Sequence, residues 1–165
     1  MTLRIAKVLL VAAIALFYTL VVFNNTTDYG TNYEFVHHVL LMDTTAPGNH
    51  GMWRAIHSPV VQTVFYVSII AWETVTMVLT WIGVVHLVRA LREPVTAFNS
   101  AKRLPIIALT VGMLLWFVAF IIVGGEWFLM WLSKIWNGQD AAFRMFAVIG
   151  IVFILLALPD TEAQP

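Results

Sequence analysis

A row of polar side chains interrupts one of the most apolar stretches of this sequence. Its members are Gln62, Tyr66, Glu73, Thr76 and Thr80. Successive members are three, four or seven residues apart, which places all of them on one face of a helix. A charge at the centre of a bilayer costs roughly 3 kcal/mol even on lenient insertion scales. We therefore expect this face, called here the polar stripe, to meet protein or water rather than lipid.

Two roles for the polar stripe follow from the chemistry of Glu73. The carboxyl group could belong to a proton or cation path, with Tyr66 and Thr76 as its neighbours. Alternatively, a protonated carboxyl could hydrogen-bond to a nearby Thr or backbone carbonyl and stabilise helix packing. The packing role is favoured, because a continuous path needs a second acidic or histidine residue deep within the membrane and none is visible.

Four histidines precede the polar stripe and lie close in sequence to Glu34 and Asp43: His37, His38, His50 and His57. Neutral imidazole is a common metal ligand, so a metal site formed by His37 or His38 with His50 is conceivable. The spacing matches no standard site. We expect interfacial histidines that hydrogen-bond to headgroups, water or loop carbonyls, with no metal and no other cofactor.

A second pair of charged residues is expected at a membrane interface. Glu126 lies near the end of one apolar segment, and Arg144 lies about one turn into the next. An ion pair would let both side chains enter the interfacial zone, and Gly124 and Gly125 would permit the close helix approach that it needs. We predict that Glu126 contacts Arg144 in a structural role.

Composition places these residues in a membrane protein. The 165 residues are 61% hydrophobic and 11% charged, and the formal net charge is zero. Such a composition is typical of a polytopic membrane protein rather than a soluble domain. The zero net charge provides no basic surface for binding nucleic acid. It contains no Cys, which excludes disulfides, zinc-thiolate sites and iron–sulfur clusters made by this chain.

Four segments are long and apolar enough to cross a bilayer: residues 5–23, 60–88, 104–132 and 141–158. All should be helices, because helices satisfy their own backbone hydrogen bonds in lipid. We predict an all-α polytopic membrane protein in which residues 1–165 form a single four-helix domain.

Basic residues predict the orientation. Six of them lie either near the start of the first segment or between the second and third segments. They are Arg4, Lys7, Arg89, Arg92, Lys102 and Arg103. The positive-inside rule then makes both termini cytoplasmic. Four Trp residues gather on the opposite side, where an aromatic belt is expected: Trp53, Trp127, Trp131 and Trp136.

The periplasmic loop, residues 24–58, should contain a short helix. Thr31 and Glu34 match the capping-box pattern, which predicts a helix over residues 32–42. Its apolar residues recur at helical spacing, so we expect it on the membrane surface or on top of the bundle. Ser58 and Pro59 predict the start of the next helix, and Asp140 is a candidate cap for the last one.

Several short motifs carry a resemblance to a known family. They are Asn24-Asn25, Asp28-Tyr29, residues 42–45, residues 51–56, Ala71-Trp72-Glu73, residues 124–127 and residues 136–144. Together they resemble a bacterial, mostly proteobacterial, family of predicted small integral membrane proteins of unknown function. The resemblance covers nearly the whole chain and implies four helices in the bacterial inner membrane. It implies no activity, ligand or catalytic residue.

Two functions are compatible with these features. The favoured one is a non-catalytic accessory subunit that packs against a larger inner-membrane complex, because nothing at fixed spacing suggests catalysis. The alternative is a small homo-oligomeric channel or transporter with Glu73 on a proton or cation path. An enzyme acting on a lipid or quinone headgroup ranks third. The expected partners are the bilayer and either other membrane subunits or further copies of the chain.

Overall fold

The computed structural model describes residues 1–161, and every regular element in that range is helical. The elements are α1 (Thr2–Thr27), α2 (Tyr29–Leu41), η1 (Met52–Arg54), α3 (Pro59–Arg89), α4 (Val95–Ala101), α5 (Arg103–Leu114), η2 (Leu115–Trp127), η3 (Met130–Leu132) and α6 (Gln139–Ala157). Four helical stretches are long and apolar enough to cross a membrane, the third being α4, α5 and η2 in sequence. The predicted all-α, four-span architecture is confirmed.

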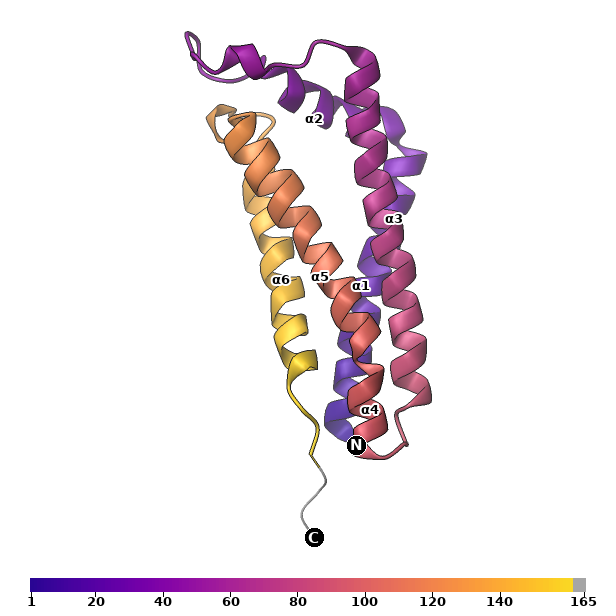
Figure 1. Ribbon diagram of the computed structural model, residues 1–165. Helices are drawn as coiled ribbons and strands as arrows, with labels where there is room; N and C mark the ends of the chain where they lie inside the picture. The colour runs from indigo at the N-terminus through magenta and orange to yellow at the C-terminus, as the bar shows by residue number, and fades with distance from the viewer. Residues whose placement is uncertain (162–165) are drawn as a thin grey trace.

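The four spans pack into an elongated bundle whose two ends differ (Figure 1). Helix α1 packs along α3, α5 packs on α3, and α6 packs on α5 and η2. The start of α1, α4 and the segment after α6 meet at one end, called here the terminal end. Helix α2, η1 and η3 gather at the other, called here the capped end.

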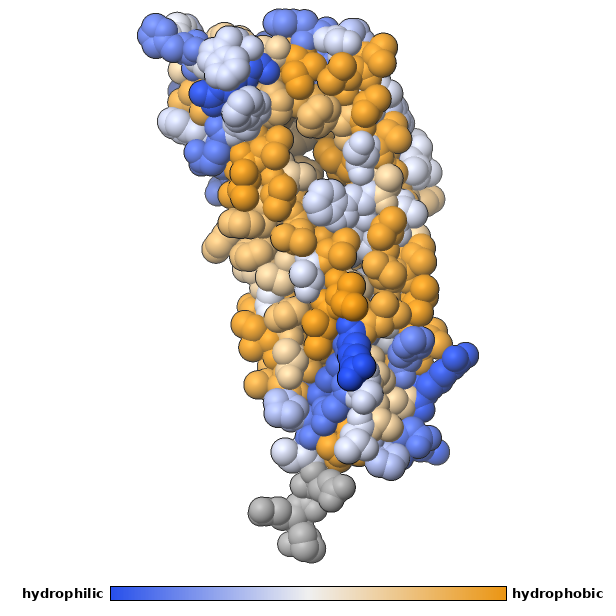
Figure 2. Space-filling model, viewed as in Figure 1, coloured by the Kyte–Doolittle hydropathy of each residue, from blue (hydrophilic) through white to orange (hydrophobic). Residues whose placement is uncertain are grey.

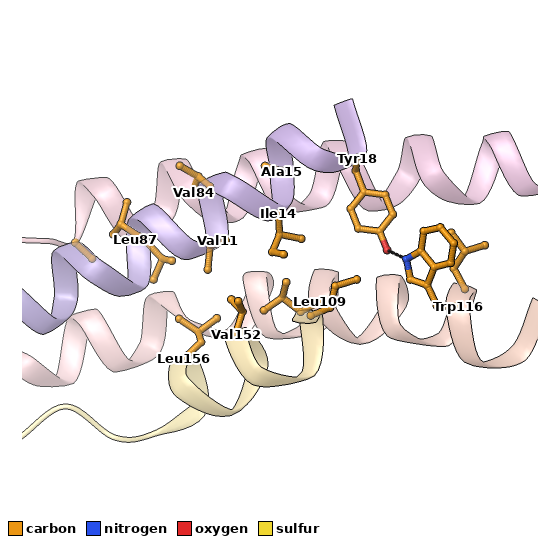
Figure 3. Close-up of a cluster of buried hydrophobic side chains, with 14 of the residues drawn as sticks. Val11, Ile14, Ala15, Tyr18, Val84, Leu87, Leu109, Trp116, Val152 and Leu156 are labelled. Atoms are coloured by element: carbon orange, nitrogen blue, oxygen red, sulfur yellow. Dashed lines mark hydrogen bonds between the residues drawn. The ribbon is translucent and has the colours of Figure 1, made fainter. Parts of the chain in front are cut away.

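The main core runs from the terminal end to the middle of the bundle. Val11, Leu87, Leu109 and Leu156 bring α1, α3, α5 and α6 together in one buried cluster (Figure 3). On α1 the cluster reaches Tyr18, which is fully buried. Trp116 and Ala142 extend the same cluster toward the capped end.

At the capped end the bundle opens. Figure 1 shows α3 and the continuation of α5 diverging, with α2 lying across the space between them. A second apolar cluster fills part of this region, with Val39 and Leu40 from α2 packed with Tyr66, Phe128 and Met130. Helix α2 therefore covers the space between α3 and the continuation of α5.

The short helix exists, but its predicted capping box does not. Helix α2 begins at Tyr29 with Asp28 in the N-cap position, and it has no side-chain capping bond. Because α1 continues to Thr27, the chain has only Asp28 in which to change direction, and Thr31 already lies inside the first turn of α2. Asn32 Nδ2 donates a hydrogen bond of 2.9 Å to the Asp28 carbonyl and secures the corner instead.

The third span also ends earlier than its apolar sequence predicts. Residues 115–127 form a π-helix, and Phe128 N donates to Val123 O, five residues earlier, at 3.0 Å. Leu129 then adopts a left-handed conformation with φ 54°, so the helix cannot continue to residue 132. Phe128 and Met130 are apolar because they pack in the capped-end cluster and not because they are membrane-spanning.

The start of α6 also differs from its prediction. Asp140 lies within the first turn and does not cap the helix, because Gly138 occupies the N-cap position. A Cβ atom at Gly138 would approach Phe35 Cζ to 2.8 Å, so this position needs glycine for α2 to pack against it. The other predicted start is confirmed in position: Ser58 is the N-cap of α3 and Pro59 follows, although Ser58 makes no side-chain capping bond.

Candidate functional site

The polar stripe of α3 faces the interior of the bundle. Gln62, Tyr66, Glu73, Thr76 and Thr80 are all buried, and Glu73 is only 1% exposed. Gly83 continues the same face, and a Cβ there would lie 2.8 Å from the Cβ of Pro105 on α5. The predicted contact of this face with protein is therefore observed.

Most of the polar stripe is satisfied by hydrogen bonds that serve packing. Thr76 Oγ1 donates to Trp72 O at 2.9 Å and Thr80 Oγ1 donates to Thr76 O at 2.6 Å, both within α3. Gln62 links α3 to the loop that precedes it, since its Nε2 donates to Ile56 O at 2.7 Å. Its Oε1 lies 2.8 Å from His37 Nδ1 of α2.

Glu73 is held by a residue of a different helix. Asn25 Nδ2, near the end of α1, donates to Glu73 Oε2 at 2.7 Å. Tyr66 OH donates to the Asn25 carbonyl at 3.0 Å, which fixes the residue from the other side. The other carboxyl oxygen of Glu73 accepts no hydrogen bond from residues 1–161, but it keeps a small accessible surface and is not a buried atom without a partner.

Glu73 borders a small cavity between α1, α2, α3 and η2, called here the head cavity. It has a volume of about 180 Å³, and its polar lining is Asn25, Asn32, Tyr66 and Glu73. Trp116 forms part of the wall, and its Nε1 donates to Tyr18 OH at 3.0 Å (Figure 3). Buried indole and phenol groups are thereby paired with each other rather than with Glu73.

A second cavity, called here the tail cavity, adjoins the first beneath α2. It has a volume of about 250 Å³ and is lined almost wholly by apolar side chains of α2, α3 and η2. Four residues line both cavities: Phe35, Val36, Ile69 and Phe120. Figure 2 shows a hollow below the capped end that is bordered mainly by hydrophobic surface.

A matching family model identifies the chain. The model described as "Predicted small integral membrane protein (DUF2165)" matches residues 3–159. The protein belongs to this family. No curated protein and no solved structure matches the chain.

The predicted pair of Glu126 and Arg144 is wrong. Within residues 1–161 these two side chains form no ion pair, and both are exposed. Residues 115–127 form a π-helix, whose turns hold more residues than α-helical turns, so side-chain directions counted on α-helical spacing do not apply at Glu126. Gly125 does permit a close approach, yet the neighbour is Gln139, whose Nε2 would lie 2.1 Å from a Cβ there.

The histidines of the capped end are dispersed. His38 Nδ1 lies 2.8 Å from Asp43 Oδ2 and its Nε2 lies 3.6 Å from Glu34 Oε2. His37 contacts Gln62, whereas His50 and His57 are exposed. Among residues 1–161, no three His, Cys, Asp or Glu side chains are arranged to hold a metal ion.

A second buried polar group, at the terminal end, was not anticipated. Asp160 Oδ2 accepts from Lys7 Nζ at 2.7 Å and also pairs with Lys102 Nζ. Both ammonium groups donate to Leu158 O at 2.8 Å, and Lys102 also donates to Asn99 Oδ1 at 2.7 Å. Burial alone would raise the pKa of Asp160, but hydrogen bonds from Lys102 and Lys7 outweigh it and keep the pKa below its usual value.

Sequence patterns located the polar stripe but missed its main partner and this terminal cluster. Asn25 precedes Glu73 by 48 residues, and nothing at fixed spacing links the two. The residue type of Asn25 offers one signal, because a polar amide near the end of an apolar helix needs a hydrogen-bond partner. Lys7 and Lys102 were assigned only to orientation, although both interrupt helices that are otherwise apolar.

Proposed function

We propose that this protein is a non-catalytic accessory subunit of the bacterial inner membrane, docked on a larger membrane complex through its capped end. The observation that carries the proposal is the apolar surface of that end. Trp53 is 74% exposed and Ile135 is 73% exposed, and Trp127 and Trp131 are about half exposed. Trp is among the residues that contribute most to protein–protein binding.

Contacts within this surface hold two of its Trp side chains together. The Arg54 guanidinium lies between two indoles, 5.5 Å from the ring centre of Trp53 and 5.4 Å from that of Trp127. Its Nη1 also donates to Trp127 O at 2.9 Å. Side chains that are already fixed lose less conformational entropy on binding, so the cluster favours docking.

The capped end is assigned to the periplasm and the termini to the cytoplasm. Support comes from the basic residues near the terminal end, which include Arg4, Arg89, Arg92 and Arg103. Loops rich in Lys and Arg remain cytoplasmic. In this orientation the exposed Trp residues lie at the periplasmic interface, where they can meet headgroups and a partner subunit together.

A channel or transporter with Glu73 on its path is the less favoured function. A path needs groups that can exchange protons or coordinate ions in sequence. The hydroxyls of Thr76 and Thr80, which follow Glu73 along α3, donate to carbonyls of their own helix. Asn25 occupies one oxygen of Glu73. These bonds support a packing role for the polar stripe.

Native mass spectrometry of gently extracted protein tests the docking role. At native expression level, we expect a different polypeptide to travel with the chain in fixed stoichiometry. The double variant Trp53→Ala/Ile135→Ala should lose that polypeptide. The matched control Ile154→Ala, which changes an exposed apolar residue of α6 near the terminal end, should retain it.

Recovery of a homo-oligomer alone would contradict the accessory role. Proton and cation flux measurements on reconstituted protein, with Glu73→Gln as the deciding variant, would then test the channel. A partner that survives loss of Trp53 and Ile135 would show that docking uses another surface.

A further inference from the structure

We propose that the head and tail cavities together bind one membrane-soluble amphiphile. Its head is an uncharged six-membered ring that carries hydroxyl or carbonyl groups, and its tail is a single hydrocarbon chain. Prenylated quinones and quinols have this chemistry. The proposal concerns a ligand site inside the bundle, so it goes beyond the docking role and is independent of it.

Glu73 has a carboxyl oxygen that no protein group within residues 1–161 engages. The residue as a whole is 1% exposed, and Asn25 donates to only one of its two carboxyl oxygens. The second oxygen keeps a small accessible surface, and Glu73 lines the head cavity, so a ligand in that cavity can reach it. A carboxyl group can accept a hydrogen bond from a ligand hydroxyl or, when protonated, donate one to a ligand carbonyl.

The size and walls of the head cavity select a flat ring. Its volume of about 180 Å³ slightly exceeds the roughly 150 Å³ of an apolar cavity that holds benzene. Tyr66, Trp116, Phe35 and Phe120 supply aromatic surface around it. Aromatic side chains stack favourably on a planar guest.

The tail cavity supplies the place for a hydrocarbon chain. Its lining includes Val39, Phe65, Val118 and Val123, and its volume is about 250 Å³. Ser68 is the one hydroxyl of the lining, and it already donates to Val64 O at 2.7 Å. Apolar cavities of this kind do not hold water and accept apolar guests. The shared residues Phe35, Val36, Ile69 and Phe120 connect the two volumes.

The charge of the lining disfavours a phosphate headgroup inside either cavity. Neither cavity has Lys, Arg or His among its lining residues, and the head cavity contains the carboxyl of Glu73. A phosphate would therefore be buried without a cation, which is strongly unfavourable. An uncharged head needs only the hydrogen bonds that Glu73 and Asn25 can make.

Binding can be tested in nanodiscs with decyl-substituted benzoquinone and its hydroquinone as probes. Ligand-induced shifts in melting temperature give affinity, and native mass spectrometry gives stoichiometry. We expect one molecule per chain. Decane, the chainless ring and decylammonium are the comparison ligands, and the ring and its chain should each bind more weakly alone than joined.

Variants of the two cavities test the binding of the ring and of the hydrocarbon chain separately. Glu73→Leu should weaken the decyl-substituted ring by about tenfold and leave decane unaffected, because only the ring loses a hydrogen bond. Ala119→Leu, which fills the tail cavity, should weaken the decyl-substituted ring and spare the chainless one. Ala71→Leu, an exposed change on the same helix as Glu73, is the matched control and should behave like the wild type.

Three results would overturn the proposal. Equal binding by every variant would show that the probe only partitions into lipid. Preferential binding of decylammonium would show that Glu73 receives a cation. Loss of the probe by Ala71→Leu would place the ligand outside the bundle. If Glu73→Leu does not fold, Ile69→Phe blocks the junction of the two cavities and should abolish binding of the chain-bearing ring.

Discussion

Two buried polar groups of this protein solve the same physical problem in different ways. At the terminal end, Oδ2 of Asp160 contacts two ammonium groups, so this carboxylate has charged partners. In the middle of the bundle, Glu73 has one uncharged side-chain partner within residues 1–161 and borders a cavity. A carboxylate paired with two cations stabilises the fold, whereas a carboxyl group with an uncharged partner beside a cavity is available for a ligand.

The surroundings of the two groups differ accordingly. The terminal cluster ties α1, α4 and the segment after α6 together, where the helices pack closely. Glu73 lines the head cavity between α1, α2, α3 and η2. Figure 1 shows α3 and the continuation of α5 diverging toward the capped end, with α2 across the space. Tight packing excludes volume that a ligand could use, so the polar group near the divergence is the candidate for function.

The largest effect is expected from Asp160→Asn. It leaves Lys7 and Lys102 buried without a carboxylate, and breaking a buried ion pair typically costs about 3–5 kcal/mol. Chemical unfolding in detergent, followed by circular dichroism, measures the loss. Asp43→Asn is the matched control, because Asp43 is exposed and its contact with His38 should contribute less than about 1 kcal/mol. Equal losses in the two variants would remove the distinction between the two ends.

A smaller effect is expected from Asn25→Ala. It removes the one protein partner of Glu73 and leaves the carboxyl unsatisfied, at a cost of about 1–3 kcal/mol. Asn24→Ala, one residue earlier and exposed, should change the free energy of unfolding by less than about 0.5 kcal/mol. If Asn25→Ala proves as mild as Asn24→Ala, water or a ligand already satisfies Glu73.

The smallest effect is the pH dependence of the terminal cluster. Because the folded-state pKa of Asp160 lies below its ordinary value, its contribution is fully present above about pH 4 and is lost as the pH falls through the folded-state pKa. Melting temperatures measured downward from about pH 6 should reveal the loss. The profile of Asp160→Asn should be flatter than that of the wild type, and an unchanged profile would assign the titration to other groups.

Features that depend on a single helix could be predicted from the sequence. Long apolar runs predict spans, and the steps between Gln62 and Thr80 predict a buried face, since both depend on helix geometry alone. Boundaries were less accurate where apolar residues serve another purpose. Phe128 and Met130 extend the apolar run past the end of the third span because they pack under α2.

Pairings between helices were the part that sequence patterns did not predict. Glu126 and Arg144 have the right depth and charge for an ion pair, yet both are exposed. Depth follows from counting residues, but the direction of a side chain depends on rotation about the helix axis. The π-helix of residues 115–127 changes that rotation in a way that no apolar pattern reveals.

Hydropathy and helical period within single segments are enough to predict the helical class, the four spans and the face of α3 that turns inward. The packed structure was needed to show that Asn25 binds Glu73, that Lys7 and Lys102 share Asp160, and that two cavities adjoin under α2. Such contacts join residues far apart in the chain, and they depend on how the helices rotate, diverge and pack against one another.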